Sequence, residues 1–236
     1  MNRLLEELRK ELRRHANKEH AAVAQRFFKT GSGEYGEGDL FLGVRVPAIR
    51  RVVKTCPETR ASDLKPLLRS PFHEERMLVL LIFVRNYEKG DGGTKREIFD
   101  IYWKNRKFVN NWDLVDASAP HIVGAYLEEK SKKALYELAR SKVLWDRRIA
   151  MMATFRYIRK QSFSETLKIA EMLLHDHEDL IQKAVGWMLR EIGKRDLEKE
   201  ELFLKSYYRT MPRTMLRYAI EAFPESKRQA YLKGKI

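Results

Sequence analysis

The chain has 236 residues, with 47 Lys and Arg against 33 Asp and Glu, so its formal net charge is +14. A field of this sign draws in polyanions, which makes nucleic acid the leading partner class. A hydrophobic content of 44% suffices for one large core or a continuous repeat array, and leaves little room for two independent enzymes. We therefore expect a single domain over residues 1–236, and a monomer.

The sequence offers no candidate for a membrane-crossing segment. No run of about 18 apolar residues exists, and the N-terminal residues alternate Leu with charged residues, unlike a signal peptide. Cys56 is the single cysteine, which excludes an intrachain disulfide and a thiolate metal cluster, and we expect it to be a small buried apolar residue. These observations predict a cytoplasmic protein with no membrane partner, nucleoid-associated when it binds DNA.

The first third of the chain predicts helices joined by one glycine-rich loop. Leu residues at helical spacing predict a helix over residues 4–12, and Asn17 caps a second helix that forms a hairpin with it. The loop Gly31–Asp39 contains a formal G-x-G-x-x-G, but it follows a helix and carries three acidic residues, which excludes a dinucleotide-binding loop. We expect a flexible connection, in which Tyr35 is positioned to cover a site.

Further helices follow in close succession. Pro47 begins a helix with one basic face, and Ser70-Pro71 begins a long one whose apolar stretch Met77–Val84 predicts burial on several sides. Thr94 is expected to cap the next helix. The brief segment Phe41–Val46 is the only candidate strand. The later elements are expected over residues 131–140, 144–160, 162–174 and 178–194, followed by a helix capped by Asp196 and a pair begun by Pro212 and Pro224.

The segment Phe108–Tyr126 is the first place to look for function. Trp112 and Asp116 are four residues apart, so a helix places an aromatic plane and a carboxylate on one face, with Asp113 one residue round. Asn110 or Asn111 is expected to cap this helix, and Pro120 to kink or end it. A buried Trp with an acidic first turn favoured by the helix dipole is the alternative interpretation.

A weak repeat links this segment to the second half of the chain. Trp112, Arg148 and Lys183 each fall early in the second helix of a predicted pair, at spacings of 36 and 35 residues. Asp116 and Trp187 each follow a member of this row by four residues. Such spacing is typical of an all-α HEAT or armadillo-like α-solenoid, in which equivalent positions line one wall. We expect that wall to be a basic concave face.

Cations recur along the predicted second helices, a distribution suited to tracking phosphates. The helix that begins at Pro47 carries further cations on one face. For any single cation, a solvated helix face is the simpler interpretation. His175 and His177 are best interpreted as a polar turn, and we expect neither a metal nor a cofactor. The candidate DNA-binding residues are Arg45, Arg50, Arg51, Lys54, Arg147, Lys183 and Arg190.

Four stretches resemble the bacterial DNA alkylation-repair glycosylases of the AlkD type. They are W-D-x-V-D at residues 112–116, Trp145-Asp-Arg-Arg148, IQKAVGWMLRE at residues 181–191 and FLGVRVP at residues 41–47. The resemblance implies an all-helical HEAT-like protein that removes N3- and N7-alkylated purines from double-stranded DNA while the lesion stays in the stack. It implies Asp116 as the catalytic carboxylate, Trp112 and Trp187 as aromatic contacts to the lesion, and Arg148 as an arginine that clamps the DNA backbone.

The chain departs from this family pattern in three places. Asn111 stands where a Trp can precede W-D, Phe27 stands where a Tyr can occur, and the loop Gly31–Asp39 is longer than in some relatives. Phe27, Tyr35 and Asp113 are candidate lesion contacts.

Two other function classes stay open. One is a basic solenoid that binds damaged or branched DNA without chemistry, and the other is a protein-interaction scaffold. Asp116 distinguishes them, because a groove that only binds phosphate gains nothing from a negative charge. An N3- or N7-alkylated purine is a cationic leaving group, so a carboxylate that stabilises the oxocarbenium-like sugar would suffice for catalysis.

Overall fold

The computed structural model describes residues 3–236, and within that range it confirms the all-α fold class, since no strand is present. The one candidate strand, residues 41–46, forms no strand: residues 41–45 are a loop that leads into α3, and an isolated β-bridge joins Leu40 and Phe72 beside it. The chain forms two compact units, Met1–Ile122 and Val123–Ile236, which are described separately. No helix within the described range is long and apolar enough to cross a bilayer.

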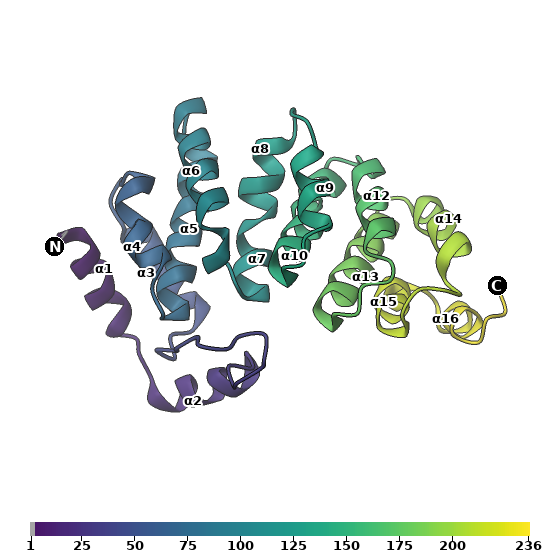
Figure 1. The fold of residues 1–236 in the computed structure, drawn as a ribbon, viewed down its shortest axis with the longest axis horizontal. Helices are drawn as coiled ribbons and strands as arrows, with labels where there is room; N and C mark the ends of the chain where they lie inside the picture. The colour runs from purple at the N-terminus through teal and green to yellow at the C-terminus, as the bar shows by residue number, and fades with distance from the viewer. Residues whose placement is uncertain (1–2) are drawn as a thin grey trace. The chain divides into compact units, whose positions relative to one another are not determined.

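The first unit consists of helices that mostly follow one another in pairs (Figure 1). Its elements are α1 (Arg3–Arg13), α2 (Lys18–Phe27), α3 (Val46–Thr55), the 3₁₀ helix η1 (Ala61–Leu64), α4 (Lys65–Leu68), α5 (His73–Lys89), α6 (Gly92–Asn105), the 3₁₀ helix η2 (Arg106–Phe108) and α7 (Trp112–Ser118).

Helix α5 is the inner helix of this unit, as predicted. It packs against α3, α4, α6 and α7, and its apolar residues from Met77 to Phe83 are all buried. The four residues before them, His73–Arg76, are also buried although all four are polar or charged. Burying such a group is costly unless it is paired, so each of these side chains requires a partner from elsewhere in the fold.

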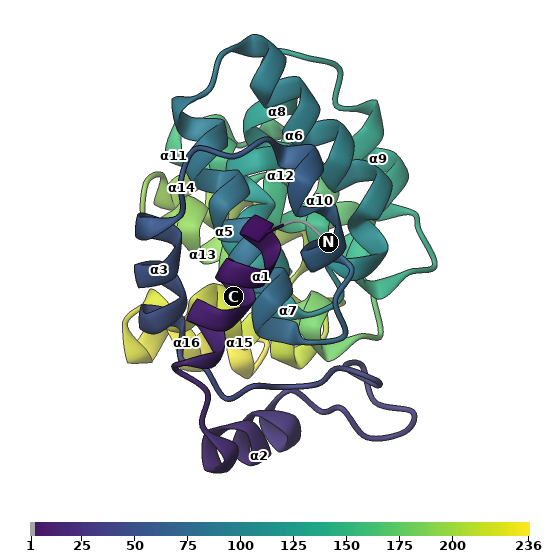
Figure 2. The same cartoon turned by 90° about the vertical axis from the view of Figure 1, so that its left-hand side faces the viewer.

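The predicted hairpin of α1 and α2 is wrong. Helix α1 packs against α3 and buries Leu5, Leu8 and Leu12, whereas α2 contains no buried residue. Figures 1 and 2 both place α2 beyond the ends of the other helices of the unit. The Asn17 cap is confirmed, because its side chain accepts a hydrogen bond from the His20 amide at 2.9 Å.

The cap of α6 differs from the prediction. Asp91, not Thr94, is the N-cap, since its Oδ1 accepts a hydrogen bond from the Thr94 amide at 2.8 Å. The helix therefore begins three residues earlier than expected, with Gly92 and Gly93 in its first turn. An aspartate at this position satisfies an amide that the helix itself leaves without a partner.

Helix α7 has the expected boundaries. Asn111 is its N-cap and accepts a hydrogen bond from the Trp112 amide at 2.9 Å. The helix ends at Ser118, and a short π-helical turn, Pro120–Gly124, follows. A proline cannot donate the next helical hydrogen bond, which explains why the regular helix stops there.

The second unit repeats the paired arrangement. Helix α13 is its inner helix and packs against α10, α12, α14 and α15. Gly186 permits the close approach of α15, since a Cβ there would lie 2.4 Å from the Met215 carbonyl oxygen. The elements are α8 (Ala125–Leu127), α9 (Lys133–Ala139), α10 (Leu144–Ala153), α11 (Phe155–Arg159), α12 (Ser164–Met172), α13 (Asp179–Gly193), α14 (Leu197–Tyr207), α15 (Arg213–Ala219), the 3₁₀ helix η4 (Ile220–Ala222) and α16 (Glu225–Leu232).

The helix boundaries correct the register of the predicted row. Arg148 is the fifth residue of α10 and Lys183 the fifth of α13, but Trp112 is the first of α7. The fifth residue of α7 is Asp116. The position equivalent to Arg148 and Lys183 is therefore Asp116, and Trp112 lies one turn before it.

Candidate functional site

Trp112 is held by two aromatic side chains from the end of α2. Phe28 stacks on the indole with ring centroids 5.4 Å apart and an interplanar angle of 20°, and Phe27 meets it edge-on at 6.0 Å. Aromatic pairs in such arrangements are worth about 0.5–1.5 kcal/mol beyond the area they bury. Helix α2 therefore contributes little to the core, and its aromatic side chains hold Trp112, a predicted lesion contact, in place.

The stack continues from Phe28 to the start of α5. The Phe28 ring lies 5.0 Å from the rings of both Phe41 and His73, and the Phe41 ring stacks on His73 at 4.6 Å with an interplanar angle of 21°. His73 is thus covered by two phenyl faces. This aromatic column, formed by Trp112, Phe28, His73 and Phe41, joins α7, α2, α5 and the loop before α3.

His73 lies between two carboxylates. Its Nε2 is 2.9 Å from Oδ2 of Asp113, and its Nδ1 is 3.3 Å from Oδ2 of Asp39. Two carboxylates as partners favour the imidazolium form, in which both ring nitrogens donate. Burial opposes this charge, but the charge of Asp113 and the hydrogen bonds from both carboxylates outweigh it, so the pKa of His73 is raised.

Asp39 anchors the end of the glycine-rich loop. Its Oδ2 accepts a hydrogen bond from Arg76 Nη2 at 2.7 Å, and its Oδ1 accepts one from Asn110 Nδ2 at 3.2 Å. Burial alone would raise the pKa of Asp39, but the His73 hydrogen bond and the Arg76 charge bring the pKa below its ordinary value. The loop predicted to be a flexible connection is therefore fixed at this end to both α5 and the start of α7.

Glu74 holds the loop before α3, which contains the one candidate strand of the sequence. Its carboxylate accepts hydrogen bonds from the amides of Leu42, Gly43 and Val44 at 2.8–3.1 Å. Gly43 has φ +77°, and a Cβ there would lie 2.0 Å from the Asn17 carbonyl oxygen. The FLGVRVP stretch is thus a loop that requires glycine and joins the start of α2 to α5.

The sequence analysis missed this buried polar cluster. The signal that could have revealed it is the HEER stretch, His73–Arg76, at the beginning of an otherwise apolar helix. Glu75, the remaining member, is buried and pairs with Arg9 at 3.2 Å and with Arg13 at 3.5 Å. Each of these four side chains therefore has a partner distant in sequence, although Nε of Arg76 makes no hydrogen bond.

A cavity of about 650 Å³ opens beside the aromatic column, and we call it the α2–α3 cavity. Its walls come from α2, from the loop before α3, from the first turn of α3, and from the start of α5. His73 and Asp113 lie at its polar end. A volume of this size falls in the ordinary range for sites that bind small organic groups.

The three candidate lesion contacts of the first unit lie close to one another. Phe27 contacts Trp112, and the Tyr35 hydroxyl is 3.4 Å from the Phe27 carbonyl oxygen, to which it donates. Asp113 faces inward to His73, while Trp112 and Asp116 are both partly exposed on α7. Trp112 and Asp116 point in roughly the same direction because they are one helical turn apart.

The remaining predicted catalytic residues belong to the second unit. Trp187 is partly exposed and lies 6.0 Å from the Phe155 ring. Arg148 is buried, with 4% of its surface exposed, and donates a hydrogen bond to the Leu180 carbonyl oxygen, which ties α10 to the start of α13. Its guanidinium therefore has a structural contact in addition to any that it makes with a ligand.

Three other predicted DNA-binding cations of this unit have acidic partners. Arg147 binds Asp176 through Nε at 2.6 Å and Nη2 at 3.3 Å. Lys183 pairs with Asp179 at 2.6 Å, and Arg190 pairs with Glu221. A phosphate would have to compete with these carboxylates for the cations.

The predicted basic face of α3 is exposed. Ala48, Ile49, Val52 and Val53 are buried on one side of this helix. Arg45, immediately before α3, lies with Nη2 2.8 Å from Nε2 of His20. The exposed cations of this face are Arg45, Arg50, Arg51 and Lys54.

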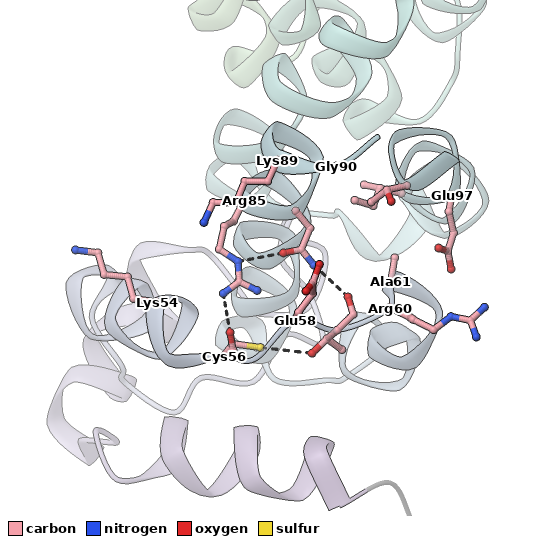
Figure 3. A pocket seen from close by; sticks show the side chains of 13 residues that line it. Lys54, Cys56, Glu58, Arg60, Ala61, Arg85, Lys89, Gly90 and Glu97 are labelled. Atoms are coloured by element: carbon pink, nitrogen blue, oxygen red, sulfur yellow. Dashed lines mark hydrogen bonds between the residues drawn. The ribbon is translucent and has the colours of Figure 1, made fainter. Parts of the chain in front are cut away.

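A second cavity, of about 660 Å³, lies between the end of α3 and the end of α5 (Figure 3). Arg85 Nη1 donates to the carbonyl oxygens of Val53 and Cys56, which closes the C-terminus of α3. Cys56 is buried, as expected. Because the Arg85 guanidinium makes these two hydrogen bonds, it stabilises the fold and contributes little positive charge to the cavity.

Metal ligands do not gather in the described residues. No group of three or more His, Cys, Asp or Glu side chains within residues 3–236 is arranged to hold an ion. His175 and His177 lie in the short connection between α12 and α13.

Comparison with known proteins identifies the family. The model of the DNA alkylation repair enzyme family matches residues 8–223, so the chain belongs to that family. A solved structure described as a predicted DNA alkylation repair enzyme from Enterococcus faecalis superposes with a TM-score of 0.68 at 17% identity, covering 89% of this chain and 98% of that one. AlkD2 from Streptococcus mutans superposes with a TM-score of 0.54 at 19% identity, covering 94% and 97%.

These likenesses confirm the fold and the family resemblance that the sequence motifs indicated. A search of curated proteins finds no match. Membership of the family gives the chain a role in DNA alkylation repair, with DNA as its partner.

Proposed function

We propose that the protein is a DNA glycosylase that hydrolyses the N-glycosidic bond of N3- and N7-alkylated purines in duplex DNA. The observation that carries this proposal is the pairing of Asp116 with a fixed indole, Trp112, one turn apart on α7. The chain around them has a net charge of +14, in which a carboxylate must weaken phosphate binding. A role in the reaction accounts for a charge that binding alone disfavours.

The chemistry requires no strong general acid. Alkylation makes the purine cationic, so the C1′–N bond can break with its electron pair going to the base, which leaves as a neutral molecule. Positive charge grows on the deoxyribose, and a carboxylate beside it stabilises the transition state more than the ground state. Water then bonds to C1′ and releases one proton, which Asp116 accepts or passes to solvent.

The tryptophans assist through their π faces. An indole attracts a cationic base or an electron-poor sugar, by about 0.5–2 kcal/mol depending on how far the site is desolvated. Trp112 is held for this role by Phe27 and Phe28, and we assign Trp187 the same role from the second unit. The exposed basic face of α3 supplies cations for the DNA backbone.

The decisive experiment is incubation of the protein with duplex DNA that contains N7-methylguanine, followed by chromatography of the released material. Free N7-methylguanine released in proportion to protein and time supports the proposal. If the protein binds this duplex but releases no base above the uncatalysed rate, the proposal fails and a non-catalytic binding protein takes its place.

A further inference from the structure

We propose that the α2–α3 cavity binds a single nucleobase, edge-on to Asp113 and flanked by the phenyl rings of α2 and of the loop before α3. This site lies to the Asp113 side of α7 and is distinct in its residues from the Trp112–Asp116 pair. The inference concerns binding only, and it holds whether or not the protein cleaves the glycosidic bond.

Part of the apolar wall of the cavity is too exposed to belong to the core. Val23, Phe27 and Val46 have 56%, 62% and 41% of their surface exposed, and all three line this cavity. An exposed apolar patch that converges on a concave site marks a binding surface. Phe28 and Phe41 supply further aromatic surface to the same cavity.

The polar end of the cavity can recognise an amino group. Asp113 is 16% exposed, and its Oδ2 accepts a hydrogen bond from His73. A carboxylate oxygen accepts more than one hydrogen bond, and carboxylates pair with exocyclic amino groups of bases. Glu74, the other acid in the lining, accepts from three backbone amides, whereas each Asp113 oxygen accepts one hydrogen bond, Oδ1 from the Leu114 amide and Oδ2 from His73, and keeps a second acceptor site for a ligand.

The rim of the cavity is suited to a phosphate. Arg45 has no acceptor atom, so in its contact with His20 the guanidinium Nη2 donates to the imidazole Nε2. The contact uses one of five guanidinium N–H groups, and the others are available for an anion. Arg45 is exposed and belongs to the basic face of α3.

The lining offers a partner for each part of a nucleotide. Arg45 can bind a phosphate, the phenyl rings can flank a base plane, and Asp113 can accept from an amino group. A lipid chain would gain nothing from the carboxylate. The base can come from a nucleotide unpaired in its strand or from a free base in solution.

The test uses 2-aminopurine, a base whose fluorescence falls when it stacks. One arm places it in a single-nucleotide bulge of a duplex, a second places it in the matched duplex, and a third adds free adenine as competitor. We expect the bulged probe to be quenched on binding and the matched probe to be quenched far less. Competition by adenine identifies a free base as a ligand, whereas no competition restricts the site to a base attached to its strand.

Two substitutions at the cavity provide the decisive comparison. Val23→Arg and Val46→Arg place a long side chain over the mouth while adding positive charge, so general DNA affinity should hold or rise. Val143→Arg, at a residue that is 51% exposed and does not line the cavity, is the matched control. We expect at least a tenfold weaker quench midpoint for the two cavity variants and no change for the control.

The proposal is overturned if both cavity variants keep the wild-type quench, or if bulged and matched probes behave alike in the wild type. Base release from N7-methylguanine duplex is measured separately on the wild-type protein. A protein that releases base but fails the 2-aminopurine test refutes this inference alone, and one that passes it without releasing base refutes only the glycosylase.

Discussion

Phe28 stacks on Trp112 with their rings 5.4 Å apart and their planes within 20° of each other. The indole of the candidate site is therefore oriented by a helix that has no buried residue of its own. The orientation of Trp112 therefore depends on its aromatic neighbours, and substitution of these neighbours tests it.

Phe28→Ala should loosen Trp112 and lower base release by about tenfold, since a catalytic contact that is misplaced by about 1 Å loses much of its effect. The measurement is single-turnover release of N7-methylguanine. Phe99→Ala is the matched control, because Phe99 stacks on Trp103 at 5.5 Å and 24°, in a place that the proposed site does not use. Equal losses in the two variants would show that the effect is one of general stability.

Asp116→Asn should reduce base release by on the order of a hundredfold or more, as the loss of a preorganised electrostatic contact does. The substitution keeps the shape of the side chain and removes its charge, so binding to undamaged DNA should stay equal or tighten. Release and affinity are measured on the same preparation. Asp100→Asn, at the end of a 3.9 Å pair with Arg96, is the control, and wild-type release by Asp116→Asn would contradict the catalytic assignment.

Arg148→Ala should weaken both DNA binding and the fold. Arg148 is buried and donates to the Leu180 carbonyl, so its removal loses a charge-assisted hydrogen bond between α10 and α13, at a cost of about 1.5–3 kcal/mol. The two effects are separated by measuring the thermal midpoint together with DNA affinity at a temperature where the variant is fully folded. If affinity is unchanged at that temperature, Arg148 acts in the fold alone and the predicted clamp is wrong.

His73→Gln should lose more stability at pH 6 than at pH 9. The folded-state pKa of His73 is raised, so its ion pairs stabilise the fold fully below about pH 6.5 and progressively less as pH rises through the folded pKa. The folded-state pKa of Asp39 is lowered, so the stability that Asp39 contributes is present above its ordinary pKa. That stability is lost as the pH falls through the folded-state pKa. Urea denaturation of both proteins at the two pH values gives the comparison. A difference in stability that does not change with pH would contradict an imidazolium at this position.

Glu200→Gln should stabilise the protein above pH 8. Burial raises the pKa of Glu200 to about 8, and the nearby Glu201 adds to the shift. An acid whose folded pKa is raised loses stability as pH climbs from its unfolded value to its folded value, and the amide avoids that loss. Thermal midpoints at pH 5 and pH 9 test this, with the exposed Glu198→Gln as control. A midpoint that falls equally at both pH values would refute it.

Periodicity and capping allowed most helices to be predicted, because both depend on residues close in sequence. Asn17, Asn111 and Asp196 each cap the helix that they were expected to cap. The face shared by Trp112 and Asp116 follows from their spacing alone. The predicted row placed Trp112 with Arg148 and Lys183, whereas Asp116 occupies the equivalent position, one turn later. This register depends on where α7 begins, which the residue spacing does not reveal.

Tertiary partners explain what the sequence could not show. The Phe27 and Phe28 pattern resembles the core face of a hairpin, yet both side chains contact Trp112, far along the chain. His73 is satisfied by Asp39 and Asp113, 34 and 40 residues away. No local pattern records such pairs, and the acidic partners of Arg147 and Arg190 were missed for the same reason.

The absence of buried side chains in α2 bears on how the molecule fluctuates. Amide hydrogen exchange proceeds through local openings, whose free energies are lowest where few apolar contacts must break. The amides of α2 should therefore exchange with solvent deuterium long before those of α5, which is buried along most of its length. One wall of the α2–α3 cavity then belongs to a helix that opens on its own, while Glu74 and His73, which also line it, belong to the buried helix α5.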